Sequence, residues 1–382
     1  MKSLFLKPRS RARVLSGHPW VFAGEVQALL PEAENGKTVL LRDSRKRILG
    51  SGIYNSQSKI IWRRYSVEKQ AFSMAYIREA LERAISRRED EPCRRLVWSE
   101  SDGLPGLVVD QFDKVLSVQA LTLAIDMRLP AIATHLQELT GAETVVFRND
   151  ASVRRLEGLD TYVRTFEDRP LEPFPAIIQG MSYTVDLLEG QKTGFYLDQR
   201  EQHALVASYA KDREVLDAFC NQGAFALQCA RAGATSVLGI DSSDTAIEAA
   251  RANAETNGLE AGFRVANVFD YFTEHRETTF GLIVLDPPPF ARSYGQLEGA
   301  IKGYKEINLR ALKALTPGGI LATYTCSQAV TMDRFTEVLV EAAADARRTV
   351  RVLHHCYQAS DHPVMLSMPE SEYLHGLILE VE

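Results

Sequence analysis

The sequence predicts an α/β protein whose C-terminal half is a doubly wound, mainly parallel sheet. From about residue 214 onward, short apolar runs alternate with helical patterns, which is the order of a parallel sheet with helices on both faces. Residues 1–66 instead show short apolar runs separated by glycine, proline and asparagine, as in a small β-barrel. A chain of 382 residues accommodates two or three domains. We therefore expect a barrel over residues 1–70, a central α+β domain over 71–175 and the sheet domain over 176–382.

The first module is strongly basic. Residues 1–70 hold 14 Lys and Arg against 5 Asp and Glu, although the whole chain has a net charge of −6. A basic module on an acidic chain favours contact with a polyanion, and phosphate contacts would orient an RNA without reading its sequence. The alternative is a basic surface that is merely solvated. The expected contacts lie outside the apolar runs: Lys7, Arg9, Arg11, Arg13, Arg42, Arg45, Lys46 and Arg47.

The central region combines one helical pattern, residues 71–89, with several short strand patterns. Three carboxylates, Glu100, Asp102 and Asp110, lie at or near its turns, where a solvated position is the commoner explanation than a catalytic cluster. We interpret this domain as a structural adaptor. A proline-rich run, residues 170–175, predicts the linker to the sheet domain.

The stretch 215–225 organises the sheet domain. An apolar strand ends in a short polar turn, and a helix pattern follows, so Gly223 would let the backbone approach a ligand at the carboxyl end of the strand. The next strand ends at Asp241, where a carboxylate accepts hydrogen bonds from ribose hydroxyls. These turns predict a nucleoside-cofactor site, with an ordinary α/β sheet as the alternative. Its further expected contacts are Asp217, Phe219, Asn221 and Ser242.

The turn favours S-adenosylmethionine (SAM) over a dinucleotide. A dinucleotide requires G-x-G-x-x-G, so that its pyrophosphate can lie on bare backbone amides, and this turn has a single glycine. A phosphate-free, cationic cofactor needs no such loop and tolerates Asp217 near its ammonium group. Farther on, Asn267 and Val268 follow a strand where an adenine ring could be recognised. A nicotinamide dehydrogenase is therefore the least favoured alternative.

A glycine-bounded loop precedes the cofactor turn and could close over the ligand. Its expected contacts are Thr193, Phe195 and Asp198. Periodicity alone favours a different interpretation, a strand–turn–helix joint with Phe195 in the core.

Asp286 and Cys326 lie just past the carboxyl ends of two successive strands, the edge at which open α/β sheets bind substrates. Pro287 and Pro288 give Asp286 a stiff, extended exit, and Phe290 could stack on a flat base. A Cys326 thiolate could add to C6 of a cytosine and make C5 nucleophilic, while Asp286 hydrogen-bonds the N3/N4 edge. Two alternatives stay open: a small buried cysteine, and methylation of a base amino group, which needs no nucleophile.

Composition excludes several classes of protein. The chain has five cysteines, an odd number, and no C-x-x-C motif. We therefore expect neither a disulfide framework nor a metal site. No apolar stretch approaches the roughly 20 residues of a membrane span, and the N-terminal apolar run is too short for a signal peptide. We expect a cytoplasmic protein that does not contact the membrane.

Four motifs together resemble the bacterial large-subunit ribosomal RNA cytosine-C5 methyltransferase family: residues 191–200, 285–291, 303–308 and 325–327. Residues 17–22 and 50–63 are similar to a PUA domain, an RNA-binding barrel. The resemblance covers essentially the whole chain. It implies a Rossmann-like class I domain with a seven-stranded sheet, SAM as methyl donor, a cytosine of 23S ribosomal RNA as substrate, Cys326 as covalent nucleophile, and a homodimer.

The chain departs from the wider group of RNA cytosine-C5 enzymes in one respect. Many of them carry a second cysteine after the Asp-x-Pro segment, where this chain has Pro289 and Phe290. The base that removes the C5 proton is therefore unassigned. Asn267 also replaces an aspartate that is common in methyltransferases. Two rival functions remain, methylation of a guanine or adenine nitrogen, and an RNA-binding protein with a vestigial cofactor pocket.

Overall fold

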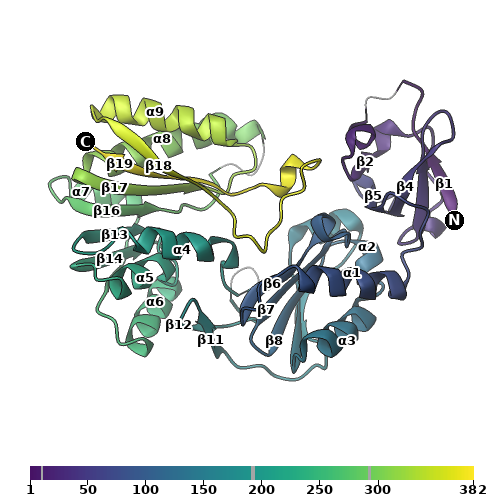
Figure 1. The fold of residues 1–382 in the computed structure, drawn as a ribbon, viewed down its shortest axis with the longest axis horizontal. Helices are drawn as coiled ribbons and strands as arrows, with labels where there is room; N and C mark the ends of the chain where they lie inside the picture. The colour runs from purple at the N-terminus through teal and green to yellow at the C-terminus, as the bar shows by residue number, and fades with distance from the viewer. Residues whose placement is uncertain (10–11, 191–193, 291–293) are drawn as a thin grey trace. The chain divides into compact units, whose positions relative to one another are not determined.

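The computed structural model describes residues 1–9, 12–190, 194–290 and 294–382 (Figure 1). The chain divides into two compact units, each of which takes segments that are distant in the sequence. The first unit comprises Met1–Ile177, Val185–Leu197 and Ser360–Ser371. The second comprises Ile178–Thr184, Asp198–Ala359 and Glu372–Glu382.

The first unit begins with a five-stranded sheet in the order β1-β3-β4-β5-β2, in which β1 and β3 pair in parallel. Leu6 and Val26 pair just beyond its two outer strands, which brings the edges together and closes the sheet. Trp62 is fully buried in this module, and its indole N–H donates to the carbonyl of Val39 at 2.9 Å. The predicted small β module is confirmed. Its strands are β1 (Lys2–Phe5), β2 (Trp20–Phe22), β3 (Thr38–Arg42), β4 (Ile48–Tyr54) and β5 (Ile60–Ser66).

A second five-stranded sheet of the first unit has the order β10-β9-β8-β7-β6, and only β8 and β9 are parallel. Helices α1 and α3 share one apolar core with this sheet, because their buried residues, such as Ile77 and Ile132, recur at helical spacing. The elements are β6 (Cys93–Trp98), β7 (Leu107–Phe112), β8 (Val115–Ala120), β9 (Thr144–Asn149), β10 (Tyr162–Thr165), α1 (Met74–Ser86), α2 (Leu123–Asp126) and α3 (Leu129–Thr140).

The three carboxylates of this region are not solvated, and that expectation was wrong. Glu100, Asp102 and Asp110 are 5%, 8% and 0% exposed. Glu100 pairs with Arg63 at 2.8 Å, Asp110 pairs with Arg95 at 2.7 Å, and Asp102 accepts from Arg88 at 3.0 Å. A buried carboxylate requires such a partner, because an unpaired charge is very costly away from water. These residues therefore stabilise the first unit.

The second unit is built on a seven-stranded sheet in the order β15-β14-β13-β16-β17-β19-β18. Its first five strands are parallel, and β19 runs antiparallel to both of its neighbours. The α/β class and the seven-stranded sheet are both confirmed. The strands are β13 (Glu214–Ala218), β14 (Ser236–Asp241), β15 (Gly262–Val265), β16 (Phe280–Leu285), β17 (Leu315–Thr325), β18 (Val350–Tyr357) and β19 (His375–Val381). A separate two-stranded sheet, β11 (Phe174–Ile178) and β12 (Met181–Val185), precedes them.

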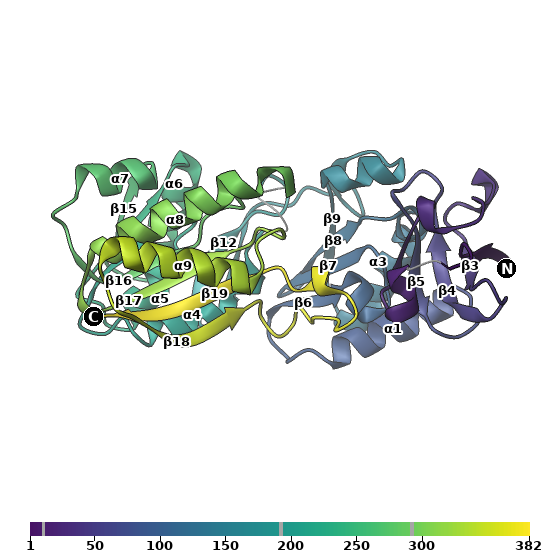
Figure 2. The ribbon, with the colours of Figure 1, turned by 90° about the horizontal axis from the view of Figure 1, so that it is seen from above.

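Helices cover both faces of this sheet (Figure 1). Helices α7, α8 and α9 share one apolar core with β13, β14, β16, β17 and β19, and α8 and α9 lie side by side (Figure 2). Helices α4, α5 and α6 lie on the other face. The helices are α4 (Arg200–Ala207), α5 (Ala224–Arg231), α6 (Asp244–Thr256), α7 (Val268–Glu274), α8 (Leu297–Lys313) and α9 (Met332–Ala346). No helix among the described residues is long and apolar enough to cross a membrane.

The strand register places four strand ends together. Ala218 lies opposite Ile240 on one side and Leu285 on the other, and Leu285 lies opposite Thr323. Because parallel strands share their carboxyl edge, the segments that follow β13, β14, β16 and β17 all emerge at this edge. We call it the carboxyl edge of the sheet.

Candidate active site at the carboxyl edge of the sheet

The turn between β13 and α5 has an unusual backbone. Phe219, Asn221 and Gly223 have φ angles of 69°, 47° and 86°, so three of five successive residues are left-handed. A bulky residue such as Phe219 rarely adopts this conformation, which costs on the order of 1–3 kcal/mol and is concentrated at functional sites. The turn is fixed to the sheet by the N–H of Cys220, which donates to the carbonyl of Ile240 at 2.9 Å.

Gly223 is required by packing as well as by its φ angle. A Cβ atom at this position would lie 3.2 Å from the Cβ of Ala250 and 3.2 Å from the ring of Phe263. The missing side chain thus allows close contact with α6 and β15. We expected Gly223 to allow the approach of a ligand, and the structure adds this packing requirement.

Asp241 joins the two turns of the predicted cofactor site. Its Oδ2 atom accepts from the N–H of Asn221 at 3.0 Å, and its Oδ1 atom accepts from the N–H of Ser243 at 3.0 Å. A carboxylate has about four acceptor positions, so positions remain for the hydroxyls of a ribose. Ser242, between these partners, is exposed.

Asp217 is buried with one oxygen unsatisfied. It is 1% exposed, and its Oδ2 atom accepts from the N–H of Ala226 at 2.9 Å. Its Oδ1 atom has no hydrogen-bond partner among the described residues. Burial, together with the nearby charges of Asp286 and Asp241, raises the pKa of Asp217 to about 7. A cation beside this carboxyl would favour its ionised form, so the chemistry of the site fits a cationic cofactor.

Asn267 and Val268 lie at the start of α7, where the first caps the helix and the second packs in the core. The side-chain oxygen of Asn267 accepts from the N–H groups of Phe269 and Asp270 at 2.9 and 3.3 Å, as a helix cap does. The residue is exposed, and its amide nitrogen is not used by the cap. Val268 is buried in the core, so any contact with an adenine would come from its backbone.

The predicted closing loop is only partly described, since Thr193 lies outside the described residues. Phe195 is 3% exposed and belongs to the first unit, whereas Asp198 belongs to the second. The Oδ2 atom of Asp198 accepts from the hydroxyl of Tyr373 at 2.8 Å, and its carbonyl accepts from Ala359 at 2.8 Å. These contacts fasten Asp198 beside the start of β19.

Sequence reasoning missed two buried residues next to this loop. His203 of α4 packs edge-on against Phe225, with ring centroids 4.4 Å apart, and burial lowers the pKa of His203 to about 3. Gln199 is 3% exposed, and neither side-chain amide atom has a hydrogen-bond partner among the described residues. Both lie in or beside the quoted motif 191–200. Periodicity could not single them out, because buried polar residues interrupt an apolar pattern without indicating their partners.

The segments that contain Asp286 and Cys326 meet at the carboxyl edge. The Sγ atom of Cys326 is 3.9 Å from the carbonyl oxygen of Pro287, the residue after Asp286. All five cysteines are described, and Cys326 alone is partly exposed. Pro287 is buried and Pro288 is exposed, so the stiff exit from β16 runs outward past the thiol.

Phe290 packs against α8. Its ring centroid lies 4.6 Å from that of Tyr304 and 6.3 Å from that of Phe269. A Cβ on Gly303 would lie only 3.1 Å from the ring of Phe290, so this glycine makes room for the aromatic contact. Tyr304 is a further residue that sequence reasoning left without a role, although it lies in the quoted motif 303–308.

Two of the basic residues of the first module form ion pairs at the surface. Arg13 pairs with Glu370 at 2.5 Å, and Arg47 pairs with Asp43 at 2.7 Å. Asp43 also accepts from the backbone N–H groups of Arg45 and Arg47, both at 2.9 Å, which shapes the turn after β3. Arg9, Arg45 and Lys46 are exposed. Arg11 lies outside the described residues.

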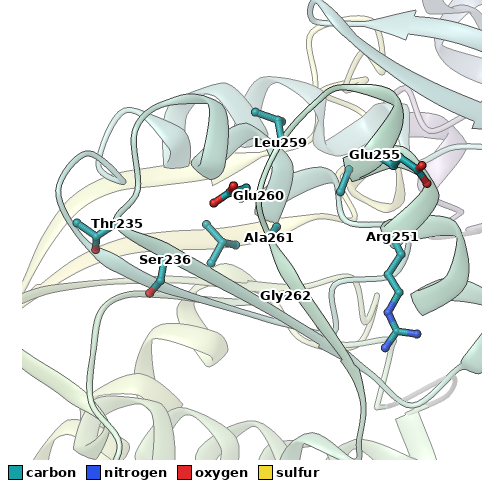
Figure 3. A pocket seen from close by; sticks show the side chains of 10 residues that line it. Thr235, Ser236, Arg251, Glu255, Leu259, Glu260, Ala261 and Gly262 are labelled. Atoms are coloured by element: carbon teal, nitrogen blue, oxygen red, sulfur yellow. The ribbon is translucent and has the colours of Figure 1, made fainter.

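A hollow of about 590 Å³ lies at the other end of the sheet (Figure 3). Ser236 and Gly262, the first residues of β14 and β15, line it together with Arg251 and Glu255 of α6. Because these strands run parallel, their first residues lie at the edge opposite Asp241, so this hollow is separate from the candidate active site. Among the described residues no group of three or more His, Cys, Asp or Glu could hold a metal ion.

Comparison with known proteins identifies the class. Residues 4–67 match the PUA-like domain family, and residues 94–368 match the S-adenosylmethionine-dependent methyltransferase family. The protein is thus a SAM-dependent methyltransferase that carries an N-terminal PUA-like domain. The predictions of SAM as cofactor and of a PUA module are confirmed.

Full-length relatives define the family more closely. "Ribosomal RNA large subunit methyltransferase I" from Serratia proteamaculans is 35% identical over 99% of both chains. The protein of the same name from Shewanella denitrificans is 37% identical over 98% of both chains. This chain belongs to the ribosomal RNA large subunit methyltransferase I family.

Solved structures show the same fold. A chain from Streptococcus mutans assigned to the SAM-dependent methyltransferases aligns over 100% of both chains with a TM-score of 0.84 and 20% identity. A methyltransferase solved in complex with S-adenosylhomocysteine (SAH) has the same coverage, TM-score and identity.

Proposed function

We propose that the protein transfers a methyl group from SAM to C5 of a cytosine in 23S ribosomal RNA, through a covalent bond between Cys326 and C6. The observation that carries this proposal is the 3.9 Å distance between the Sγ atom of Cys326 and the carbonyl oxygen of Pro287. This contact joins a partly exposed thiol to the residue after Asp286, and it supports a shared site at the edge where parallel sheets hold their ligands. The names of the full-length relatives support ribosomal RNA as the substrate.

Cys326 acts as the nucleophile in this mechanism. Its thiolate forms an Sγ–C6 bond, and the electron pair of the C5–C6 double bond moves to C5. When bound, SAM would supply its sulfonium methyl group to C5, with SAH as the leaving group. Cys326 leaves as a thiolate when the C5 proton is lost, either to water or to a side chain of another loop. Asp286 hydrogen-bonds the N3/N4 edge of the cytosine and so stabilises the charge that develops on the ring.

Residues on the neighbouring strands hold the cofactor. Asp241 accepts from the ribose hydroxyls with the acceptor positions that its backbone partners leave open. The buried Asp217 lies beside the ammonium group of SAM, because a nearby cation offsets the cost of ionising this carboxyl. The turn at Asn267 faces the adenine, and Asp198 completes the site. Further contacts come from Phe219, Asn221, Ser242, Val268, Thr193 and Phe195.

The substrate base is reached from RNA that the PUA-like module grips by its backbone. Arg9, Arg45 and Lys46 support this role because their side chains are exposed. A base inside a helix cannot reach Cys326, so the enzyme takes an unpaired or flipped cytosine between Pro288 and Phe290. We expect a homodimer in the cytoplasm, which analytical ultracentrifugation and fractionation would test.

Capture by 5-fluorocytosine tests the covalent step. Fluorine at C5 cannot leave as the proton does, so a wild-type enzyme given SAM and 5-fluorocytosine-containing ribosomal RNA should become cross-linked. Cys326→Ala should form no cross-link and methylate no RNA, with SAM binding intact. A Cys326→Ala protein that still methylates RNA would support the alternative, transfer to a guanine or adenine nitrogen. Mass spectrometry of the RNA digest identifies the modified base in either case.

A further inference from the structure

Three hydroxyl groups form a closed ring around the backbone at Cys326. Thr325 donates through Oγ1 to the hydroxyl of Tyr304 at 2.8 Å, and the Tyr304 hydroxyl lies 2.9 Å from Oγ of Ser327. The N–H of Ser327 donates back to Oγ1 of Thr325 at 3.2 Å. All three residues are at most 1% exposed. One phenol on α8 therefore holds the residues on both sides of the half-buried cysteine.

The aromatic ring of the same residue contacts the other motif. The ring of Phe290 lies 4.6 Å from the ring of Tyr304, centroid to centroid. Phe290 ends the segment that begins at Asp286. Tyr304 thus contacts the segment of Asp286 through its ring and through a hydrogen bond of its hydroxyl with the backbone of Phe290. The same hydroxyl contacts the residues on both sides of Cys326.

We propose that Tyr304 is a positioning residue that sets the Sγ atom of Cys326 against the Asp286–Phe290 segment. The inference rests on the proposed function, in which both segments act on the same cytosine. Cys326 directly follows β17, whose pairing with β19 ends at Thr325. The hydroxyl ring restrains the residues on both sides of it. Misplacement of a reacting group by about 1 Å can cost on the order of 100-fold in rate, so such a restraint matters for catalysis.

A purely structural role would not require the hydroxyl. The surroundings of Tyr304 are apolar, with Phe335 5.6 Å from its ring, and phenylalanine would fill the same core. A buried hydroxyl is costly unless it is paired. This hydroxyl is bonded to Thr325 and Ser327, which flank the cysteine, and also to the backbone of Phe290. Burial raises the pKa of Tyr304, so the phenol stays protonated and can donate to Ser327.

Tyr304→Phe removes the hydroxyl, with its bonds to Thr325, Ser327 and the backbone of Phe290, and keeps the ring against the ring of Phe290. We expect capture of 5-fluorocytosine RNA to slow by about tenfold, the effect of one or two hydrogen bonds, with unchanged affinity for SAM and RNA. The rate and pH profile of Cys326 alkylation by iodoacetamide should also change. The alkylation measured in the folded protein is that of Cys326, because the other four cysteines are buried.

Two variants serve as controls. Tyr209→Phe also removes a paired phenol of the second unit, whose hydroxyl lies 2.8 Å from Nε2 of His354, and should leave capture and alkylation unchanged. Gly303→Ala presses on the ring of Phe290, which holds the atoms nearest to the added Cβ, so it should slow capture with little effect on alkylation of Cys326.

Unchanged capture and alkylation in Tyr304→Phe would overturn the inference. So would equal losses in Tyr304→Phe and Tyr209→Phe that track their melting temperatures, since these indicate a general loss of stability. A wild-type enzyme that captures no RNA would instead contradict the proposed function. Alkylation needs neither RNA nor cofactor, so it would still report whether Tyr304 restrains Cys326.

Discussion

The Oδ2 atom of Asp241 accepts a hydrogen bond from the N–H of Asn221 at 3.0 Å, so the turns after β13 and β14 form one connected structure. A change at Asp241 therefore alters both the expected ribose contact and the left-handed turn that contains Phe219 and Gly223.

Asp241→Ala should weaken SAM binding by about 10- to 100-fold, because hydrogen bonds to a charged group contribute roughly 1.5–3 kcal/mol. Asp241→Asn keeps a hydrogen-bond acceptor at this position, so it should reduce the affinity for SAM by a smaller factor than Asp241→Ala does. Isothermal titration calorimetry with SAM and SAH measures both. Asp244→Ala is the matched control, since this exposed carboxylate lies on the first turn of α6. Equal affinities for Asp241→Ala and Asp244→Ala would exclude Asp241 from the cofactor site.

Asp217 should make stability depend on pH. Its pKa in the folded protein is about 7, above the ordinary value of 3.8. Between these values the folded protein holds a proton that the unfolded chain has lost. The free energy of unfolding of the cofactor-free protein should therefore fall as the pH rises from about 4 to about 7. Asp217→Asn should remove this pH-dependent change in the free energy of unfolding, which amounts to up to about 4 kcal/mol. Urea denaturation at pH 5 and at pH 8 measures the change in the wild type and in the variant.

Cofactor binding should be linked to the same proton. A cation near Asp217 favours the ionised carboxyl, so SAM affinity should rise with pH between about 5 and 7, with release of a proton. The number of protons released on binding is measured by calorimetry in several buffers that differ in their enthalpy of ionisation. Asp217→Asn should bind SAM without the pH dependence, and Asp244→Asn should retain it. A wild-type affinity that is independent of pH would place the ammonium group away from Asp217.

The exposed cations of the first module should set the salt dependence of RNA binding. Arg45→Ala and Lys46→Ala should each reduce the slope of log affinity against log salt by about 0.7, the value for one phosphate contact with a single strand. Arg13→Ala should reduce it less, because Arg13 is paired with Glu370. Filter binding across a salt series measures the slopes. Slopes identical to the wild type would place the RNA on another surface.

The buried ion pair of Arg95 and Asp110 should be needed for the stability of the first unit. Asp110→Ala leaves Arg95 without its bidentate partner and should lower the free energy of unfolding by about 3–5 kcal/mol. Glu82→Ala, at the exposed pair with Arg78, should change it little. Chemical denaturation followed by circular dichroism compares the two. If Asp110→Ala and Glu82→Ala both changed the free energy of unfolding only slightly, water would have to reach Asp110.

Particular residues show how far the sequence could predict the site. Asp241, Asp286 and Cys326 each follow an apolar run, and parallel strands bring such positions to one edge, so their approach was predictable from their order alone. The same order led to SAM as cofactor and to the α/β class, both of which are confirmed. The roles of these residues in catalysis remain predictions for the experiments above.

Other features depend on partners that the sequence does not indicate. The burial of Glu100, Asp102 and Asp110, the pairing of Arg13 with Glu370, and the hydroxyl ring of Tyr304 all join residues far apart in the chain. A charged or hydroxyl residue has the same local pattern whether it is solvated or paired. Its environment is therefore decided only when the chain folds.

The sequence by itself determined the succession of strands and helices and the residues that follow each strand, because hydrophobic periodicity and turn residues act locally. It thereby determined which side chains reach the carboxyl edge of the sheet. Only the tertiary structure decided which of them are buried or paired: the unsatisfied oxygen of Asp217, the packing at Gly223 and the hydrogen bonds of Tyr304 with Thr325 and Ser327. These properties arise from close packing between distant segments, which no local pattern encodes.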